Sequence, residues 1–481
     1  MQKTIEDGLK GIDKTSLPGK FKCWCLQFVL YPRVLWPMMM YEIAMSRIEI
    51  IEQRCNRYIR KWLGLPRMIT TTALYGRSCP LTLPLASIKE EFKAGKVRTV
   101  MTLRYSKDDK IRDDPPEVRS GKKWRAETAV NDLIGQLEHK DIIGSVQTNR
   151  EGLGARSFKP FCASNAAEKR KAIINELRLS EDEERRVKLV QCSVQGQCLQ
   201  WESVTVERKI TWKEIWAWET ARTSFLIKST YDVLPSPANL KRWKLGEDDK
   251  CRCGEKGTMK HILSHCPLGL DRRTWRHNEV LKVLEEAFKE KIQEINNGSA
   301  PQIDELMKIN FVKEGKTTNA KNRRSKRSDP KWCGKWKVAA DLDTPLIFPL
   351  VATTQRPDLV LWSDDQRRAI VMELTISWED NIKAAEDRKA ERYKELVEKC
   401  EEAGWDIEYY HIGIGARGYI DKSFNFLVRN RLAITQAEAN KLIEKIQQTV
   451  EKASLWLWLK RDEANWNPTS NKSLITSDVR H

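Results

Sequence analysis

Two apolar runs, each carrying one acid, enclose a charged turn in the C-terminal third of the chain. The runs "DLVLW" and "AIVMEL" have the length and the composition of buried strands. If they pair antiparallel around a two- or four-residue loop centred just after Asp365, Asp358 lies directly opposite Glu373. Opposed carboxylates repel each other and destabilise a sheet, so the pattern predicts a cation between them. Mg²⁺ prefers oxygen ligands and keeps several waters, so two carboxylates are enough to hold it.

The segment that follows this hairpin predicts a long helix with a lysine on its inward face. "DNIKAAEDRKAERYKELVEKCEEAG" has apolar residues at helical spacing and ends in a glycine. Lys389 falls on the apolar stripe, where an ammonium group is costly unless it meets an anion such as the acid pair or a phosphate. The alternative is a lysine at the edge of the stripe with its charged end in water, and two unrelated acids. The other residues of the stripe are Ile382, Ala385, Tyr393, Leu396 and Cys400.

Two acids and a lysine are the groups used in metal-assisted hydrolysis of a phosphodiester. Asp358 and Glu373 would hold Mg²⁺, which lowers the pKa of a bound water and neutralises charge on the phosphate. Lys389 would orient the water or stabilise the developing negative charge. The pattern therefore predicts a catalytic role for these three residues.

A second candidate site is the cysteine and histidine cluster "CRCGEKGTMKHILSHC". Cys251, Cys253, His261 and Cys266 are separated by one, seven and four residues, and four soft ligands suit a structural zinc ion because no position is left for water. The first spacing is shorter than usual, and His265 is a competing ligand. The alternative is coincidence among the twelve cysteines of the chain.

Basic residues are in large excess. The 481 residues carry a formal net charge of +18, and the pI is about 9.3. The excess indicates either a polyanionic partner, such as a nucleic acid or an acidic membrane surface, or simply a solvated basic surface. One face of an expected helix at 47–63 and the stretch "TNAKNRRSKRSD", which is also typical of a nuclear-import signal, are candidate phosphate-binding surfaces. The candidate contacts are Arg54, Arg57, Arg60, Arg323, Arg324 and Arg327.

Neither a membrane span nor a secretion signal is expected. The segment "MQKTIEDGLKGIDK" lacks the apolar core of a signal peptide. The most apolar stretch of the chain is interrupted by Arg33 and Glu42. We therefore expect the protein in the nucleus or the cytoplasm and not outside the cell, where a reducing environment favours metal-binding cysteines over disulfides.

The order of these features resembles the C-terminal portion of proteins encoded by non-long-terminal-repeat retrotransposons that carry a restriction-like endonuclease. "LPGKFKCWCLQFVLYPRVLWPMMMYE" looks like the thumb of their reverse transcriptase, and "SGKKWRAETAV" and "ITWKEIWAWETARTSFLIKSTYDVLPSP" look like the linker. "CRCGEKGTMKHILSHC" is similar to their CCHC zinc knuckle, and "WRHNEVL" to a short motif after it. "RPD", "MELT", "DRKAERY" and "GARG" resemble in order the core of a PD-(D/E)xK nuclease. The polymerase signature, an aromatic residue before x-Asp-Asp, does not occur, so no reverse transcriptase activity is expected from this chain alone.

The resemblance implies roles for individual residues. Asp358 and Glu373 match the two acids of the nuclease. Lys389 matches a lysine that these nucleases carry in the following helix, and Tyr393 matches a tyrosine near it. The E-x-K pattern itself is not met, because Thr375 stands where the lysine is usual. The residues implied to contact DNA or to support cleavage are Arg276, His277 and Asn278.

These expectations describe a multidomain chain that is mainly α-helical, with an α/β domain near its C-terminus. The leading function is a Mg²⁺-dependent endonuclease that nicks DNA, with structural zinc and with RNA as a further candidate partner. The alternatives are a nucleic-acid-binding remnant without catalysis and a protein–protein scaffold. The expected segments are a helical thumb at 1–105, a helical linker at 106–244, a CCHC zinc knuckle at 245–280, a restriction-like nuclease at 281–460 and a disordered tail at 461–481.

Overall fold

The protein is mainly helical, with a small mixed sheet in its C-terminal region, as the sequence predicts. The computed structural model describes residues 2–151, 160–297, 332, 334–342, 344–430 and 434–463. The chain forms two compact units, the first of Met1–Gly196 with Lys209–Ser224 and the second of Gln197–Arg208 with Phe225–His481. Residues 464–481, most of the predicted disordered tail, lie outside the described residues.

The first unit is built from amphipathic helices. α4 buries one stripe of residues, Ile48, Ile51, Cys55, Ile59 and Trp62, while α6, α8 and α9 share a second cluster of buried apolar side chains. Its elements are α1 (Gln2–Lys14), α2 (Gly19–Cys25), η1 (Leu26–Leu30), α3 (Tyr31–Met40), α4 (Met45–Trp62), α5 (Thr72–Tyr75), β1 (Leu81–Thr82), α6 (Ile88–Arg104), α7 (Asp109–Asp113), α8 (Ala126–Glu151), α9 (Ala166–Val190) and α10 (Trp212–Ala217). Within the part of the chain that the structure describes, no helix has the length and apolar content needed to cross a membrane.

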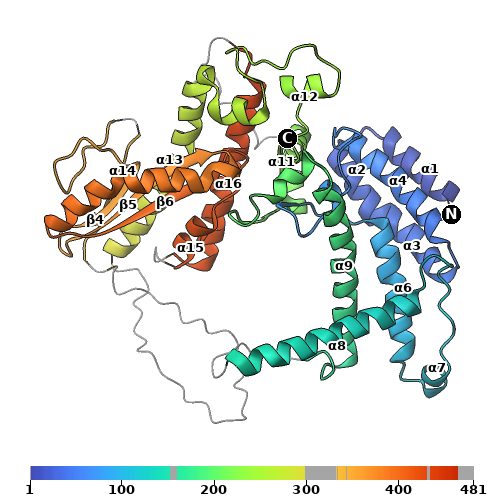
Figure 1. Cartoon of the computed structure of the whole chain (residues 1–481). Coiled ribbons are helices and arrows are strands. Elements are labelled where there is room, and N and C mark those ends of the chain that lie inside the picture. The colour runs from blue at the N-terminus through green and yellow to red at the C-terminus, as the bar shows by residue number, and fades with distance from the viewer. Residues whose placement is uncertain are drawn as a thin grey trace. The chain divides into compact units, whose positions relative to one another are not determined.

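The second unit contains the sheet and both candidate sites (Figure 1). Its elements are α12 (Pro237–Arg242), η3 (His261–His265), η4 (Pro267–Gly269), α13 (Leu270–Asn296), β3 (Lys337–Ala340), β4 (Leu359–Ser363), β5 (Arg368–Ser377), η5 (Glu379–Asn381), α14 (Ile382–Glu402), β6 (Asp406–Gly415), α15 (Lys422–Asn430) and α16 (Gln436–Leu459). Three short elements contain residues at which the chain changes from one unit to the other, η2 (Gln195–Leu199), β2 (Arg208–Lys209) and α11 (Thr220–Thr230).

The sheet has the strand order β3-β4-β5-β6. β4 pairs antiparallel with β3 and with β5, and β5 pairs parallel with β6. A parallel neighbour requires a crossover connection, and α14 provides it between β5 and β6 (Figure 1). This connection places α14 directly after the strand that carries Glu373.

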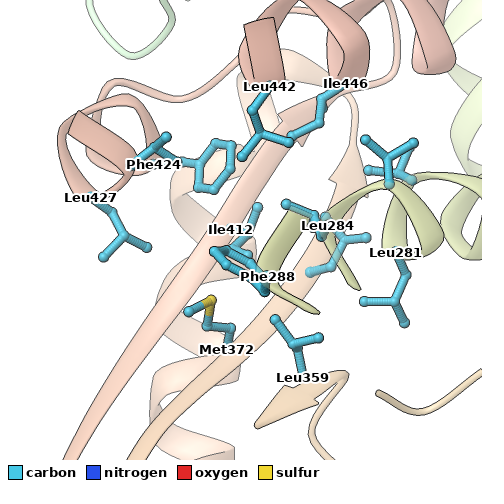
Figure 2. Close-up of a cluster of buried hydrophobic side chains, with 14 of the residues drawn as sticks. Leu281, Leu284, Phe288, Leu359, Met372, Ile412, Phe424, Leu427, Leu442 and Ile446 are labelled. Atoms are coloured by element: carbon cyan, nitrogen blue, oxygen red, sulfur yellow. The ribbon is translucent and has the colours of Figure 1, made fainter. Parts of the chain in front are cut away.

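Each face of the sheet is covered by different helices. On one face, side chains of α13, α15 and α16 converge on β4, β5 and β6, and Figure 2 shows this core. On the other face, α14 packs against alternate residues of the same strands. The labelled residues of Figure 2 are Leu281, Leu284, Phe288, Leu359, Met372, Ile412, Phe424, Leu427, Leu442 and Ile446.

The predicted stripe of α14 is confirmed. Its five apolar residues are buried, and Lys389 lies on the same stripe with 30% of its side chain exposed. The helix begins at Ile382, after the short turn η5, and Gly404 ends it with a φ of +80°. A positive φ of this kind favours glycine, because it has no Cβ.

The structure divides the chain at other positions than the predicted segments do. α13 is one continuous helix from Leu270 to Asn296, so the predicted boundary after residue 280 falls inside it. The predicted linker at 106–244 is also divided, because residues 197–208 and 225–244 belong to the second unit. Helix propensity continues smoothly through "WRHNEVLKVLEEAF", and no glycine or proline marks a break there.

Candidate metal centres

The four predicted zinc ligands come together in the structure. One ligand atom from each of Cys251, Cys253, His261 and Cys266 lies within 4.8 Å of the others. Sγ of Cys251 is 3.7 Å from Sγ of Cys266, and Sγ of Cys253 is 3.0 Å from Nε2 of His261. This Cys₃His group could hold a metal ion such as zinc, and four protein ligands would give it a closed, structural site.

Two short turns position these ligands. In the first, the amide of Gly254 donates to the carbonyl of Cys251 at 2.8 Å, and Gly254 has a φ of +91°. In the second, η3 is a π-helical turn in which the amide of Cys266 donates to the carbonyl of His261 at 2.7 Å. Met259, which precedes η3, and Ile262 and Leu263, which lie in it, are buried in one apolar cluster with Trp378 and Leu457. This packing fixes the position of η3.

His265, the competing ligand, lies outside the group. Its Nδ1 is 3.3 Å from the carbonyl oxygen of Lys260, and the residue is exposed. Residues four apart lie on one side of an α-helix, and on that basis His265 and His261 compete. Among the described residues, the ligand group includes His261 and not His265.

Arg276, predicted to contact DNA or to support cleavage, is buried. It is 1% exposed, and its guanidinium donates to Oγ of Ser454 at 2.9 Å and to the carbonyl of Leu263 at 3.1 Å. The first bond reaches α16 and the second reaches η3. In this structure the guanidinium is therefore enclosed within the second unit, and its role in binding or cleavage stays a prediction.

The acid pair has the predicted register. Ser363 pairs with Arg368 and Leu359 with Met372, which leaves a four-residue loop between β4 and β5. Asp358 immediately precedes β4, at the position that continues this register opposite Glu373. The two residues are also linked, because the amide of Asp358 donates to Oε2 of Glu373 at 3.3 Å.

Asp358 and Lys389 reach Glu373 and its neighbour from different elements. β4 begins at Leu359, opposite Met372, so it does not extend as far as Leu374. The amide of Leu374 instead donates to Oδ2 of Asp358 at 2.7 Å. The side chain of Lys389 extends from α14 toward the sheet and donates to Oε1 of Glu373. The predicted convergence of Lys389 on Glu373 is therefore present.

Tyr393 is next to this group, and its hydrogen bond with Glu373 acts to lower the pKa of that carboxyl. It is buried, and its hydroxyl donates to the carbonyl of Arg356 at 2.9 Å. Arg356 begins the "RPD" segment, so the tyrosine holds the chain before Asp358 against α14. This contact is a positioning role for Tyr393 in this structure.

His277 joins the acid pair from the opposite face of the sheet. Its Nε2 is 3.4 Å from Oδ2 of Asp358 and 3.2 Å from the carbonyl oxygen of Leu374. Its Nδ1 is 3.3 Å from Oδ1 of Asn278. The motif predicted from resemblance therefore has two parts, since Arg276 bonds to η3 of the Cys₃His group, while His277 lies beside Asp358 and Asn278 contacts the ring of His277.

Burial and charge shift the pKa values at the acid pair. Burial, together with the charge of Asp358, raises the pKa of Glu373 above its ordinary value, although Lys389 acts in the opposite direction. For His277, burial lowers the pKa, but the bond to Asp358, the charge of Asp358 and the bonds to Asn278 and Leu374 together raise it overall. Groups whose pKa values are shifted in this way are typical of functional sites and also of structural ion pairs.

The predicted phosphate-binding arginines differ in their burial and in their existing partners. Arg54 is half-buried and pairs with Glu6. Arg60 is also half-buried and donates to the carbonyl of Ile69 at 2.9 Å. Arg57 is exposed. The remaining candidates, Arg323, Arg324 and Arg327, lie outside the described residues.

A third group of metal-binding side chains was not predicted. Ligand atoms of Glu386, His411 and Asp421 lie within 4.8 Å of one another. They come from α14, β6 and the start of α15, so no sequence spacing joins them. The one sequence signal is His411 itself, a polar residue within the otherwise apolar and aromatic run "YYHIGIG".

No protein-family model and no curated protein matches this chain.

Proposed function

We propose that this protein is a Mg²⁺-dependent DNA endonuclease of the kind carried by non-long-terminal-repeat retrotransposons. The observation that carries the proposal is the convergence of Asp358, Glu373, Lys389 and His277 at the point where β4 begins. Two acids on a sheet, with a lysine from the following helix, are a donor set suited to phosphodiester hydrolysis. With DNA as its substrate, the protein would act in the nucleus rather than in the cytoplasm.

Each side chain of the group has a distinct role in this proposal. Asp358 and Glu373 supply the carboxylate oxygens that Mg²⁺ prefers, and bound Mg²⁺ would activate a water and neutralise charge on the phosphate. Lys389 pairs with Glu373 in the structure. When a cation takes that carboxylate, the ammonium of Lys389 is released to stabilise the phosphate.

His277 has a positioning role. Its contacts with Asp358 and with the carbonyl of Leu374 hold the carboxylate of Asp358 at the end of the strand. Asn278 contacts the other ring nitrogen and so fixes the orientation of the imidazole. These contacts tie the beginning of α13 to the acid pair.

The alternative function, a nucleic-acid-binding protein without catalysis, is favoured by one observation. Both acids already have partners, because Lys389 pairs with Glu373 and the amide of Leu374 bonds to Asp358. A fully paired group of this kind is also a stable structural network. Under this alternative, DNA or RNA would bind to basic surfaces and no strand would be cut.

Nicking of supercoiled plasmid distinguishes the two functions. We expect the purified zinc-loaded chain to convert supercoiled plasmid to the open circle when Mg²⁺ is added, and not when it is left out. Mg²⁺ should be omitted rather than chelated, because a chelator would also remove metal from the Cys₃His group. Plasmid that stays supercoiled while the protein binds it would support the non-catalytic alternative.

We also expect DNA binding to weaken steeply as salt rises, because each neutralised phosphate releases counterions. Each contact contributes about −0.9 to the slope of log affinity against log salt. Arg57→Ala is expected to reduce that slope by about one. Arg112→Ala is the matched control, since this arginine pairs with Asp109 at 2.6 Å on another helix of the same unit. Fluorescence anisotropy with labelled DNA measures both slopes, and a flat dependence would instead favour the protein scaffold.

A further inference from the structure

Glu386, His411 and Asp421 form a group beneath α14, on the same face of the sheet as Glu373. His411 is the register partner of Glu373 across the parallel pair β5 and β6, and alternate residues of each strand face α14. Glu386 is three residues before Lys389 on α14, so the two side chains are neighbours on one face of the helix. The group is therefore adjacent to the acid pair but shares no residue with it.

His411 is buried without hydrogen-bond partners among the described residues. It is 7% exposed, and neither Nδ1 nor Nε2 has a partner there. Buried polar atoms are nearly always paired, because an unpaired one loses its bonds to water without compensation. An imidazole with two open nitrogens, beside two carboxylates, indicates a ligand that the group is built to receive.

The three side chains already stand at nearly the separation that one ion requires. Their ligand atoms lie within 4.8 Å of one another. Nitrogen and oxygen ligands at about 2.0–2.2 Å from an ion lie up to about 4 Å apart, so a small closing movement is enough. Burial lowers the pKa of His411, which keeps the imidazole in the neutral form that binds metals.

A glycine makes room for this arrangement. A Cβ at Gly413 would lie 2.7 Å from Cγ2 of Ile382 and 3.2 Å from Oδ2 of Asp421. The glycine therefore allows the carboxylate to lie over β6, two residues from His411. The amide of Asp421 also donates to the carbonyl of Gly413 at 3.0 Å, which holds the backbone of the aspartate at this position.

The existing partners of the two carboxylates leave them able to bind an ion. Asp421 accepts from the amide and the hydroxyl of Ser423 at 3.1 and 2.7 Å, and each oxygen has a second lone pair. Oε2 of Glu386 accepts from Lys383 at 2.9 Å. That lysine is exposed, so the pair is weak and exchanges readily with solvent.

We propose that Glu386, His411 and Asp421 bind one divalent first-row transition-metal ion, of which Mn²⁺ is the representative, at a site separate from the acid pair and from the Cys₃His group. One imidazole and two carboxylates suit such an ion, whereas Mg²⁺ prefers oxygen ligands alone and zinc favours the cysteines. The ion joins α14 to β6 and to the start of α15. Because Glu386 and Lys389 share one turn of α14, it also fixes where Lys389 points.

Electron paramagnetic resonance of Mn²⁺ added to the zinc-loaded full chain tests this site. We expect a bound Mn²⁺ whose pulsed spectrum shows coupling to a ¹⁴N nucleus, the sign of an imidazole ligand. His411→Gln should abolish the coupling. Glu386→Gln, a milder change on a half-exposed residue, should weaken binding of the nitrogen-coupled ion at least tenfold, whereas Asp387→Asn should leave it unchanged, because Asp387 is the adjacent exposed acid.

Variants of the acid pair separate this proposal from the proposed function. Mn²⁺ bound by the acid pair should show no nitrogen coupling. Asp358→Asn should remove this ion and leave the nitrogen-coupled ion in place. If Asp358→Asn removes no ion, the endonuclease site fails while the present site stands. Absence of coupling in the unsubstituted chain, its persistence in His411→Gln, or its loss in His277→Gln would each overturn the site proposed here.

Discussion

Replacing Asp358 with Asn, or Glu373 with Gln, is expected to lower the rate of Mg²⁺-dependent plasmid nicking by at least about 10³-fold. Each substitution removes one of two carboxylate ligands, and a catalytic ion contributes several kcal/mol at about 1.4 kcal/mol per factor of ten. Both replacements keep the shape of the side chain. DNA affinity, measured by anisotropy, should therefore change little while the nicking rate in a time course falls.

Two further variants sharpen this comparison. Asp364→Asn removes a carboxylate from the loop of the same hairpin, where it pairs with Lys337 on the surface, and should cut as the unsubstituted chain does. Lys389→Ala should slow nicking about 10²–10³-fold, the usual loss for one charge-stabilising group, yet retain Mg²⁺ binding. Equal rates for Asp358→Asn and Asp364→Asn would contradict the proposed role of the acid pair.

Cys251→Ser is expected to release the metal from the Cys₃His group and to unfold the segment around it. Loss of an outer-shell partner already weakens metal binding about 10–100-fold, and loss of a ligand should weaken it more. The apolar residues Met259 and Leu263 would then lose their fixed support. Elemental analysis of zinc per chain and amide hydrogen exchange across residues 251–266 measure the two effects.

Cys162→Ser is the matched control for this change. Cys162 is an exposed free thiol in the first unit, so its replacement should alter neither the zinc content nor the hydrogen exchange. We also expect Cys251→Ser to weaken binding to nucleic acid. A chain purified without chelator that contains no zinc, or a variant that retains one zinc per chain, would contradict the assignment of these ligands.

Local patterns in the sequence predicted the geometry of the acid pair well. The register of β4 and β5 follows from two apolar runs with one turn between them, and the buried stripe of α14 follows from helical spacing. Both depend only on residues that are near in sequence. The same is true of the Cys₃His group, whose four residues lie within one short segment.

Contacts between distant segments could not be predicted in this way. Arg276 is buried because α16 supplies Ser454 as its partner, and nothing near Arg276 in the sequence indicates this. Glu386, His411 and Asp421 meet only because a parallel crossover brings three elements together. For a related reason, the spacing of residues around position 280 could not show that one helix, α13, contacts both sites.

That helix, α13, constrains how the protein can change in length. Arg276 bonds to η3 of the Cys₃His group, and the next residue, His277, contacts Asp358. Inserting or deleting one residue between Leu270 and Arg276 would turn the start of α13 by about 100° and shift it by about 1.5 Å relative to His277. The bond from Arg276 to η3 and the contact of His277 with Asp358 could then not both be kept. The two centres therefore constrain each other to one fixed spacing along α13.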